Sequence, residues 1–102
     1  MALTIYVEDE LHTRLRDFSD EPENSFLNLC RRCTVAGTKV MDVIDPYTDA
    51  MLNFIQLDRL ISELGKVLDG DLRPSEREVT EEVLRAAMEA REISGYLFIQ
   101  GD

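Results

Sequence analysis

Two cysteines, Cys30 and Cys33, are separated by two arginines in this 102-residue chain. A pair with this spacing can act as a redox dithiol, because neighbouring arginines lower the pKa of a thiol. A structural role is favoured, since the pair falls on the apolar face of a short helix expected over residues 25–33. A zinc site needs four ligands, and the chain has no second cysteine pair.

His12 is the only histidine. A histidine that acts as a general base needs an orienting carboxylate and a nucleophile nearby. The sequence supplies only the neighbouring carboxylates Glu8 and Asp9, so we expect His12 to be exposed or half-buried without a catalytic role. The chain also lacks a glycine-rich phosphate loop and a nucleophile elbow. The sequence therefore predicts neither an enzyme nor a bound cofactor.

Three aspartates, Asp42, Asp45 and Asp49, lie within eight residues, and Asp58 follows. Carboxylates of this kind hold Mg²⁺ or Ca²⁺, but their spacing lacks the frame of a calcium-binding loop. The alternative is that they stabilise a turn and the start of the helix that follows, where negative charge is favourable. We favour that alternative and predict no metal site.

The charge of the chain is strongly unbalanced. It has 21 acidic and 11 basic side chains, a formal net charge of −10 and a pI near 4.4. Such a charge disfavours direct binding to nucleic acid, which needs clustered lysine and arginine, and disfavours docking on an anionic membrane. It would attract a basic protein partner and accelerate the encounter, although solubility alone also explains an acidic surface.

The N-terminal stretch MALTIYVEDE has neither a basic start nor an apolar core, so it does not predict a secretory signal. No apolar run approaches the roughly 20 residues of a membrane-spanning helix. Together with the two cysteines, these features predict a reduced, cytoplasmic setting.

Apolar periodicity predicts a succession of short elements. Strands are expected over residues 3–7, 39–44 and 96–100, with a few further extended residues at 50–53. Short helices are expected over residues 9–18 and 25–33. In the first of these, Leu11, Leu15 and Phe18 would share one side.

Two longer amphipathic helices are expected in the second half of the chain. The first presents apolar residues at helical spacing and ends at Gly70; these residues are Leu57, Leu60, Ile61, Leu64 and Leu68. The second is expected to open in the segment 74–78, with Ser75 as its N-cap and Glu78 completing a capping box, and to end at Gly95. Its inward-facing residues are Val79, Val83, Ala86, Ala87, Ala90 and Ile93.

These elements predict one α+β domain over residues 1–102. A small sheet of three or four strands would be covered by two main amphipathic helices plus one or two short helices. The strand order is left open, as is a homodimer formed through an exposed sheet edge.

Residues 45–64, DPYTDAMLNFIQLDRLISEL, resemble a motif of short bacterial proteins. That motif reads Asp-Pro-Tyr-Gly-Asp, then mainly apolar positions, an asparagine, two further positions, a glutamine and an amphipathic helix. Such chains also close on an aromatic strand ending in Gly-Asp, as YLFIQGD does here. Thr48 stands where the motif has glycine. The matching residues are Asp45, Pro46, Tyr47, Asp49, Asn53 and Gln56.

The resemblance implies a stand-alone protein of the immunity type, which neutralises a toxin inside the producing cell. We therefore predict a protein-binding inhibitor of a basic toxin or enzyme, with partner-binding residues Asp45, Tyr47, Asp49, Asn53, Gln56 and Asp58. Asn53 and Gln56 could equally tie a turn to the start of a helix. One alternative function is a small regulatory domain that binds a metal or metabolite at the 45–56 loop. Another is an inhibitor that mimics DNA through carboxylates spaced along a ridge.

Overall fold

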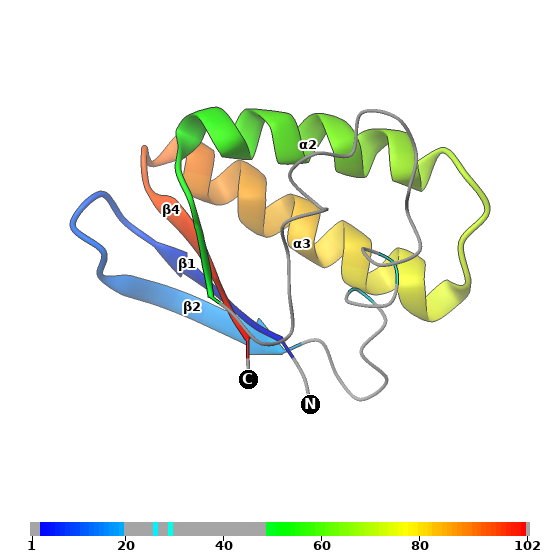
Figure 1. Ribbon diagram of the computed structural model, residues 1–102, viewed down its shortest axis with the longest axis horizontal. Coiled ribbons are helices and arrows are strands. Elements are labelled where there is room, and N and C mark those ends of the chain that lie inside the picture. The colour runs from blue at the N-terminus through cyan, green and yellow to red at the C-terminus, as the bar shows by residue number, and fades with distance from the viewer. Residues whose placement is uncertain (1–2, 20–25, 27–28, 30–48, 102) are drawn as a thin grey trace.

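The computed structural model shows an α+β fold, as the sequence predicted (Figure 1). It describes residues 3–19, 26, 29 and 49–101. The expected helix over 25–33, the expected strand over 39–44 and both cysteines lie outside the described residues, apart from Phe26 and Leu29. The elements are β1 (Thr4–Glu8), β2 (Arg14–Ser19), β3 (Ala50–Leu52), α2 (Phe54–Leu68), α3 (Pro74–Glu92) and β4 (Tyr96–Gln100).

The four strands form one antiparallel sheet in the order β2-β1-β4-β3. The first and last strands of the sequence are therefore the two central strands, and Thr4 of β1 lies opposite Gln100 of β4. α2 and α3 lie side by side over one face of the sheet (Figure 1). No described element covers the other face, which we call the open face.

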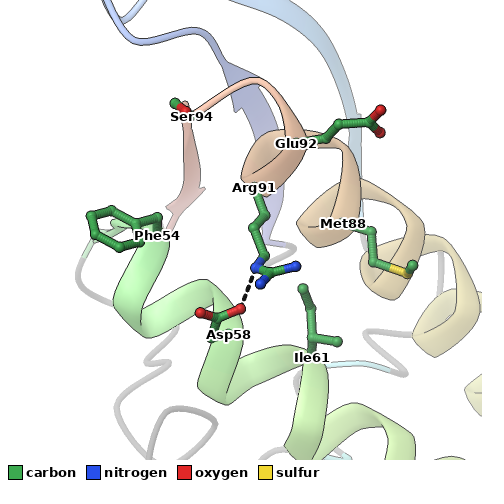
Figure 2. A pocket seen from close by; sticks show the side chains of 7 residues that line it. All are labelled: Phe54, Asp58, Ile61, Met88, Arg91, Glu92 and Ser94. Carbon is green, nitrogen blue, oxygen red and sulfur yellow. Dashed lines mark ion pairs between the residues drawn. The ribbon is translucent and has the colours of Figure 1, made fainter.

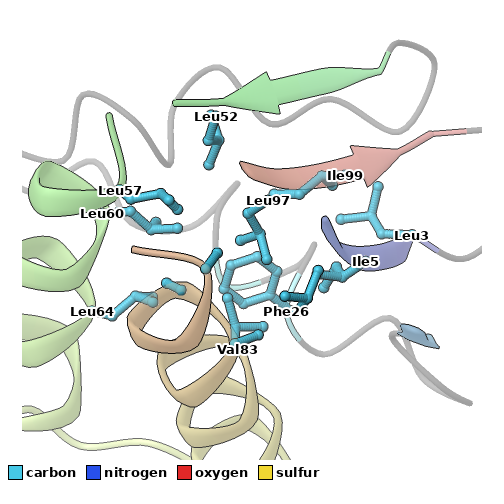
Figure 3. Close-up of a cluster of buried hydrophobic side chains, with 14 of the residues drawn as sticks. Leu3, Ile5, Phe26, Leu52, Leu57, Leu60, Leu64, Val83, Leu97 and Ile99 are labelled. Atoms are coloured by element: carbon cyan, nitrogen blue, oxygen red, sulfur yellow. The ribbon is translucent and has the colours of Figure 1, made fainter. Parts of the chain in front are cut away.

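The core lies between the sheet and the two helices (Figure 3). The strands predicted over residues 3–7 and 96–100 are confirmed, and every second side chain of β1 and β4 points into the core. Burial of each such apolar side chain contributes about 1.5–3 kcal/mol. The fully buried apolar residues are Leu3, Ile5, Val7, Phe26, Leu29, Leu52, Leu57, Leu60, Leu64, Val83, Ala86, Ala87, Ala90, Leu97 and Ile99.

The helix predicted over residues 9–18 is wrong. These residues form a loop followed by β2, which pairs with β1 and contains an irregularity opposite Val7 and Glu8. Among the described strands β2 lies at one edge of the sheet, and Phe18 is its only half-buried residue. Its apolar residues therefore do not alternate with polar ones. Their spacing matches one side of a helix by chance, while the hydrogen bonds that decide the structure come from β1.

The start and end of α3 also differ from the prediction. Pro74 is the first helical residue, a position where the missing N–H of proline costs no hydrogen bond. The side chain of Glu76 accepts a hydrogen bond from the backbone N–H of Arg73 at 3.0 Å. Ser75 and Glu78 therefore lie inside the helix. Ile93 lies just beyond its last residue and is 38% exposed rather than inward-facing. Within the described residues, neither helix has the length and apolarity needed to cross a membrane.

Candidate functional site

Two of the predicted partner-binding residues build the start of α2. The side-chain oxygen of Asn53 accepts hydrogen bonds from the backbone N–H groups of Ile55 and Gln56, both at 3.1 Å. The side chain of Gln56 accepts one from the backbone N–H of Asn53 at 3.0 Å. This reciprocal capping box satisfies N–H groups that a helix start otherwise leaves unpaired. The arrangement gives Asn53 and Gln56 the structural role that the sequence left open.

Asp49 and Asp58, the other predicted site residues that the structure describes, each contact a different part of the fold. Asp49 accepts a hydrogen bond from the backbone N–H of Gly101 at 3.0 Å, next to the end of β4. Asp58 forms an ion pair with Arg91 across the two helices. Asp45 and Tyr47 lie outside the described residues.

Asp58 and Arg91 lie in a hollow of about 550 Å³ between the first turns of α2 and the last turns of α3 (Figure 2). We call this hollow the α2–α3 groove. Three apolar side chains supply much of its wall: Phe54, which is 60% exposed, Met88, which is 53% exposed, and the half-buried Ile61. The groove is completed by Glu92 and Ser94.

The open face carries a cluster of aromatic side chains on its two central strands. The rings of Tyr6 and Phe98 stack with their centroids 5.9 Å apart. The guanidinium carbon of Arg14 lies 3.9 Å from the centroid of the Tyr6 ring and 5.6 Å from that of Phe98. The hydroxyl of Tyr6 donates a hydrogen bond to the side chain of Gln100 at 3.0 Å. All three aromatic residues of the two strands, Tyr6, Tyr96 and Phe98, are only half-buried.

A buried carboxylate lies beside these rings. Glu8 is 3% exposed, although it belongs to the open face. Its Oε1 lies 3.0 Å from Nδ1 of His12 and its Oε2 lies 3.7 Å from Nε of Arg14. The imidazole of His12 also stacks on the ring of Tyr96, with centroids 4.2 Å apart. His12 is exposed, as predicted, but its imidazole is held by the carboxylate of Glu8 and by the ring of Tyr96.

The loop between β1 and β2 holds His12 in this place. The side chain of Asp9 accepts hydrogen bonds from the backbone N–H groups of Leu11 at 2.9 Å and Thr13 at 2.8 Å. The backbone of His12 has a φ of 64°, a left-handed conformation that non-glycine residues adopt at a cost. The Asp9 bonds stabilise this turn, and as a result the imidazole folds back over Glu8.

The turn between α3 and β4 approaches the same place from the other side. Ser94, at a φ of 56°, is the second left-handed non-glycine residue of the described chain. A Cβ atom on Gly95 would lie 2.0 Å from the backbone oxygen of Glu8. Only glycine therefore allows the turn to approach β1 this closely, which brings Tyr96 under His12.

Exposed apolar side chains gather at this end of the molecule. Among the described residues, the large apolar side chains that are exposed are Leu11, Leu15, Met51, Phe54, Ile55, Met88 and Ile93. Most belong to the β1–β2 loop, the first turn of α2 or the end of α3, which lie at the left of Figure 1. Several exposed apolar residues in one region are typical of an interaction surface.

The open face therefore offers stacked rings, one arginine and a buried carboxylate that orients a histidine. Tyr6, Tyr96 and Phe98 alternate along their strands with fully buried residues, so each lies on the face away from the core. No sequence signal showed that these side chains meet, because the meeting depends on the pairing of β1 with β4. The described residues contain no group of three or more His, Cys, Asp or Glu side chains placed to hold a metal ion.

Comparison with known proteins found no matching family model, no matching curated protein and no matching solved structure.

Proposed function

We propose that this protein is a protein-binding inhibitor of the immunity type, which docks on a basic protein and blocks it. The observation that carries the proposal is the open face, where Tyr6, Phe98 and Arg14 stack without a described element over them. Aromatic residues and arginine contribute most of the binding energy in many protein interfaces. Their rings are rigid, so little conformational entropy is lost when a partner covers them.

The net charge supports a basic partner. A chain with a formal charge of −10 attracts a positively charged protein at long range, and salt weakens that attraction. Two copies of this chain repel one another by the same rule. A different, basic protein is therefore the better occupant of the open face.

The described part of the 45–56 segment gives no support to a metal or metabolite site. The side chains of Asn53 and Gln56 already bond to the backbone at the start of α2. Asp49 bonds to the backbone of Gly101. These groups stabilise the fold at this end of the sheet, and we place the docking surface on the open face instead.

The proposal is tested with the protein encoded by the adjacent gene. Co-expression should protect cells from any growth defect that this neighbour causes. Titration calorimetry of the two purified proteins should show binding that is tighter at low salt than at high salt. An absence of binding at both salt concentrations overturns the inhibitor proposal for this partner.

Two variants with the same charge change locate the surface. Phe98→Lys places a positive charge in the middle of the open face and should weaken binding by about tenfold or more, as expected for a central contact residue. Ser75→Lys adds the same charge at the exposed start of α3 and should bind nearly as tightly as the wild type. Circular dichroism confirms that both variants are folded. Equal binding by both variants shows that the partner does not use the open face.

A further inference from the structure

The α2–α3 groove is a second surface whose side chains the fold leaves uncovered within the described part of the chain. It lies on the helical layer, on the other side of the sheet from the open face (Figures 1 and 2). Phe54, Ile61 and Asp58 line it from α2 at positions i, i+7 and i+4, which share one side of a helix. Met88 and Arg91 line it from α3. Phe54 and Met88 are exposed and lie outside the core, while Ile61 is half-buried and packs partly against it.

The charges of the groove leave it negative. The ion pair between Asp58 and Arg91 joins the two helices and neutralises the only cation among the lining residues. Glu92 has no ion pair within the described chain and adds an uncompensated negative charge. Glu81, two turns before Met88 on α3, is exposed and likewise has no ion pair within the described chain. The exposed Arg85 lies between them on the same side of α3, so Glu81, Arg85 and Glu92 together carry a net charge of −1. The apolar groove thus lies beside unpaired carboxylates.

We propose that the α2–α3 groove binds an amphipathic helix of another protein, with apolar residues on one side and lysine or arginine along the border. Two helices lying side by side form a furrow in which the ridge of a third helix packs. Apolar side chains of the incoming helix would contact Phe54, Ile61 and Met88. Its cations would lie near Glu92 and Glu81. This inference does not depend on the proposed function of the open face.

Charge argues against a second copy of this chain in the groove. The described part of α3 carries six acidic and three basic residues, so it has a net charge of −3 (3 − 6). A helix of this kind would bring like charges against Glu81 and Glu92. A helix with the opposite charge has the complementary character.

The test uses three synthetic peptides of about five helical turns. The first consists of leucine and lysine with the leucines at helical spacing, the second has the same residues in scrambled order, and the third replaces lysine with glutamate. Fluorescence anisotropy should show that the first peptide binds wild-type protein about tenfold tighter than the second, while the third does not bind. Met88→Lys should remove the difference between the first two peptides, and the control Ser75→Lys should retain it.

Several outcomes would overturn the inference. Equal binding of the ordered and scrambled peptides would show that bulk charge alone attracts them. Loss of the difference in Phe98→Lys but not in Met88→Lys would place the peptide on the open face. Sedimentation that shows a wild-type dimer, which Met88→Lys dissociates, would assign the groove to a second copy. Binding of the neighbouring gene's product through the open face is measured in a separate experiment. Failure of one proposal can therefore be told apart from failure of the other.

Discussion

The two faces of the sheet are made from alternate residues of the same strands, yet they differ in what surrounds them. In β4, Leu97 is fully buried under the helices, while the next residue, Phe98, is half-buried on the open face. β1 repeats the contrast with Val7 and Tyr6. Packing against α2 and α3 explains the first set of residues. It does not explain why large rings occupy the second set, and the docking surface that we propose would account for them.

The strongest test of this comparison pairs two neighbouring residues. Leu97→Ala should lower the free energy of unfolding by about 2–5 kcal/mol, because it leaves a cavity in the core. Phe98→Ala should lower it by about 1 kcal/mol or less, because its ring is already partly in water. Urea unfolding followed by circular dichroism measures both values. Equal losses would mean that the open face contributes as much to stability as the core face does.

Gly95 lies where the α3–β4 turn contacts β1. Its substitution tests how strongly this close contact, which sets the position of the helices relative to the sheet, contributes to stability. Gly95→Ala should destabilise the protein by about 1–3 kcal/mol, since its Cβ would lie 2.0 Å from the backbone oxygen of Glu8. Gly65 in α2 is the matched control, because a Cβ there has nothing within 4 Å. Gly65→Ala should stabilise the helix by about 0.5–1 kcal/mol. Thermal unfolding of the two variants should therefore shift in opposite directions.

Glu8 is the exception on the open face, because it is buried. Glu8→Ala removes the hydrogen-bond partner of His12 and the ion-pair partner of Arg14. It should cost about 1.5 kcal/mol of stability, the lower end of the range for hydrogen bonds to a charged group, because His12 is exposed. Glu10→Ala, in the exposed loop two residues on, should cost almost nothing. Proton NMR of the His12 ring should also show loss of the upfield shift caused by Tyr96 in the Glu8 variant only. An unchanged ring signal would mean that Glu8 does not hold the histidine.

Substitution of Asn53 distinguishes a structural role of this residue from a role in partner binding. Asn53→Ala should lower stability by about 1 kcal/mol, the usual cost of losing an N-cap side chain. Ser62→Ala, on the exposed side of α2, should leave stability unchanged or slightly raised. Neither variant should alter partner binding in calorimetry. A large loss of binding in Asn53→Ala at unchanged stability would return the docking surface to the segment that the sequence predicted.

Local patterns predicted the elements whose own residues determine them. The leucine spacing of α2, the alternation of β1 and the strand Tyr96–Gln100 are all confirmed. The prediction failed for β2, because its identity depends on hydrogen bonds to another strand rather than on its own apolar pattern. The predicted N-cap of α3, Ser75, lies inside the helix, because Pro74 takes the first helical position that proline prefers.

The site could be predicted less well for the same reason. The asparagine and glutamine of the 45–64 motif were recognised, but their spacing suits a capping box as well as a binding loop. Tyr6 and Gln100 form a hydrogen bond although they are 94 positions apart. No periodicity within a strand reveals such a contact. The exposed ends of α2 and α3 meet only after the two helices have packed.

The position of β4 also determines the order in which the sheet can assemble. β4 is the last strand of the sheet to leave the ribosome, yet it lies between β1 and β3. Two local units, the β1–β2 hairpin and the α2–α3 pair, can form during synthesis. The sheet gains its centre only when β4 inserts, and we expect this long-range pairing of β1 with β4 to form more slowly than the local pairings. Until that insertion the nascent chain exposes the edge of β1, and a chaperone that covers this edge would favour correct folding over aggregation.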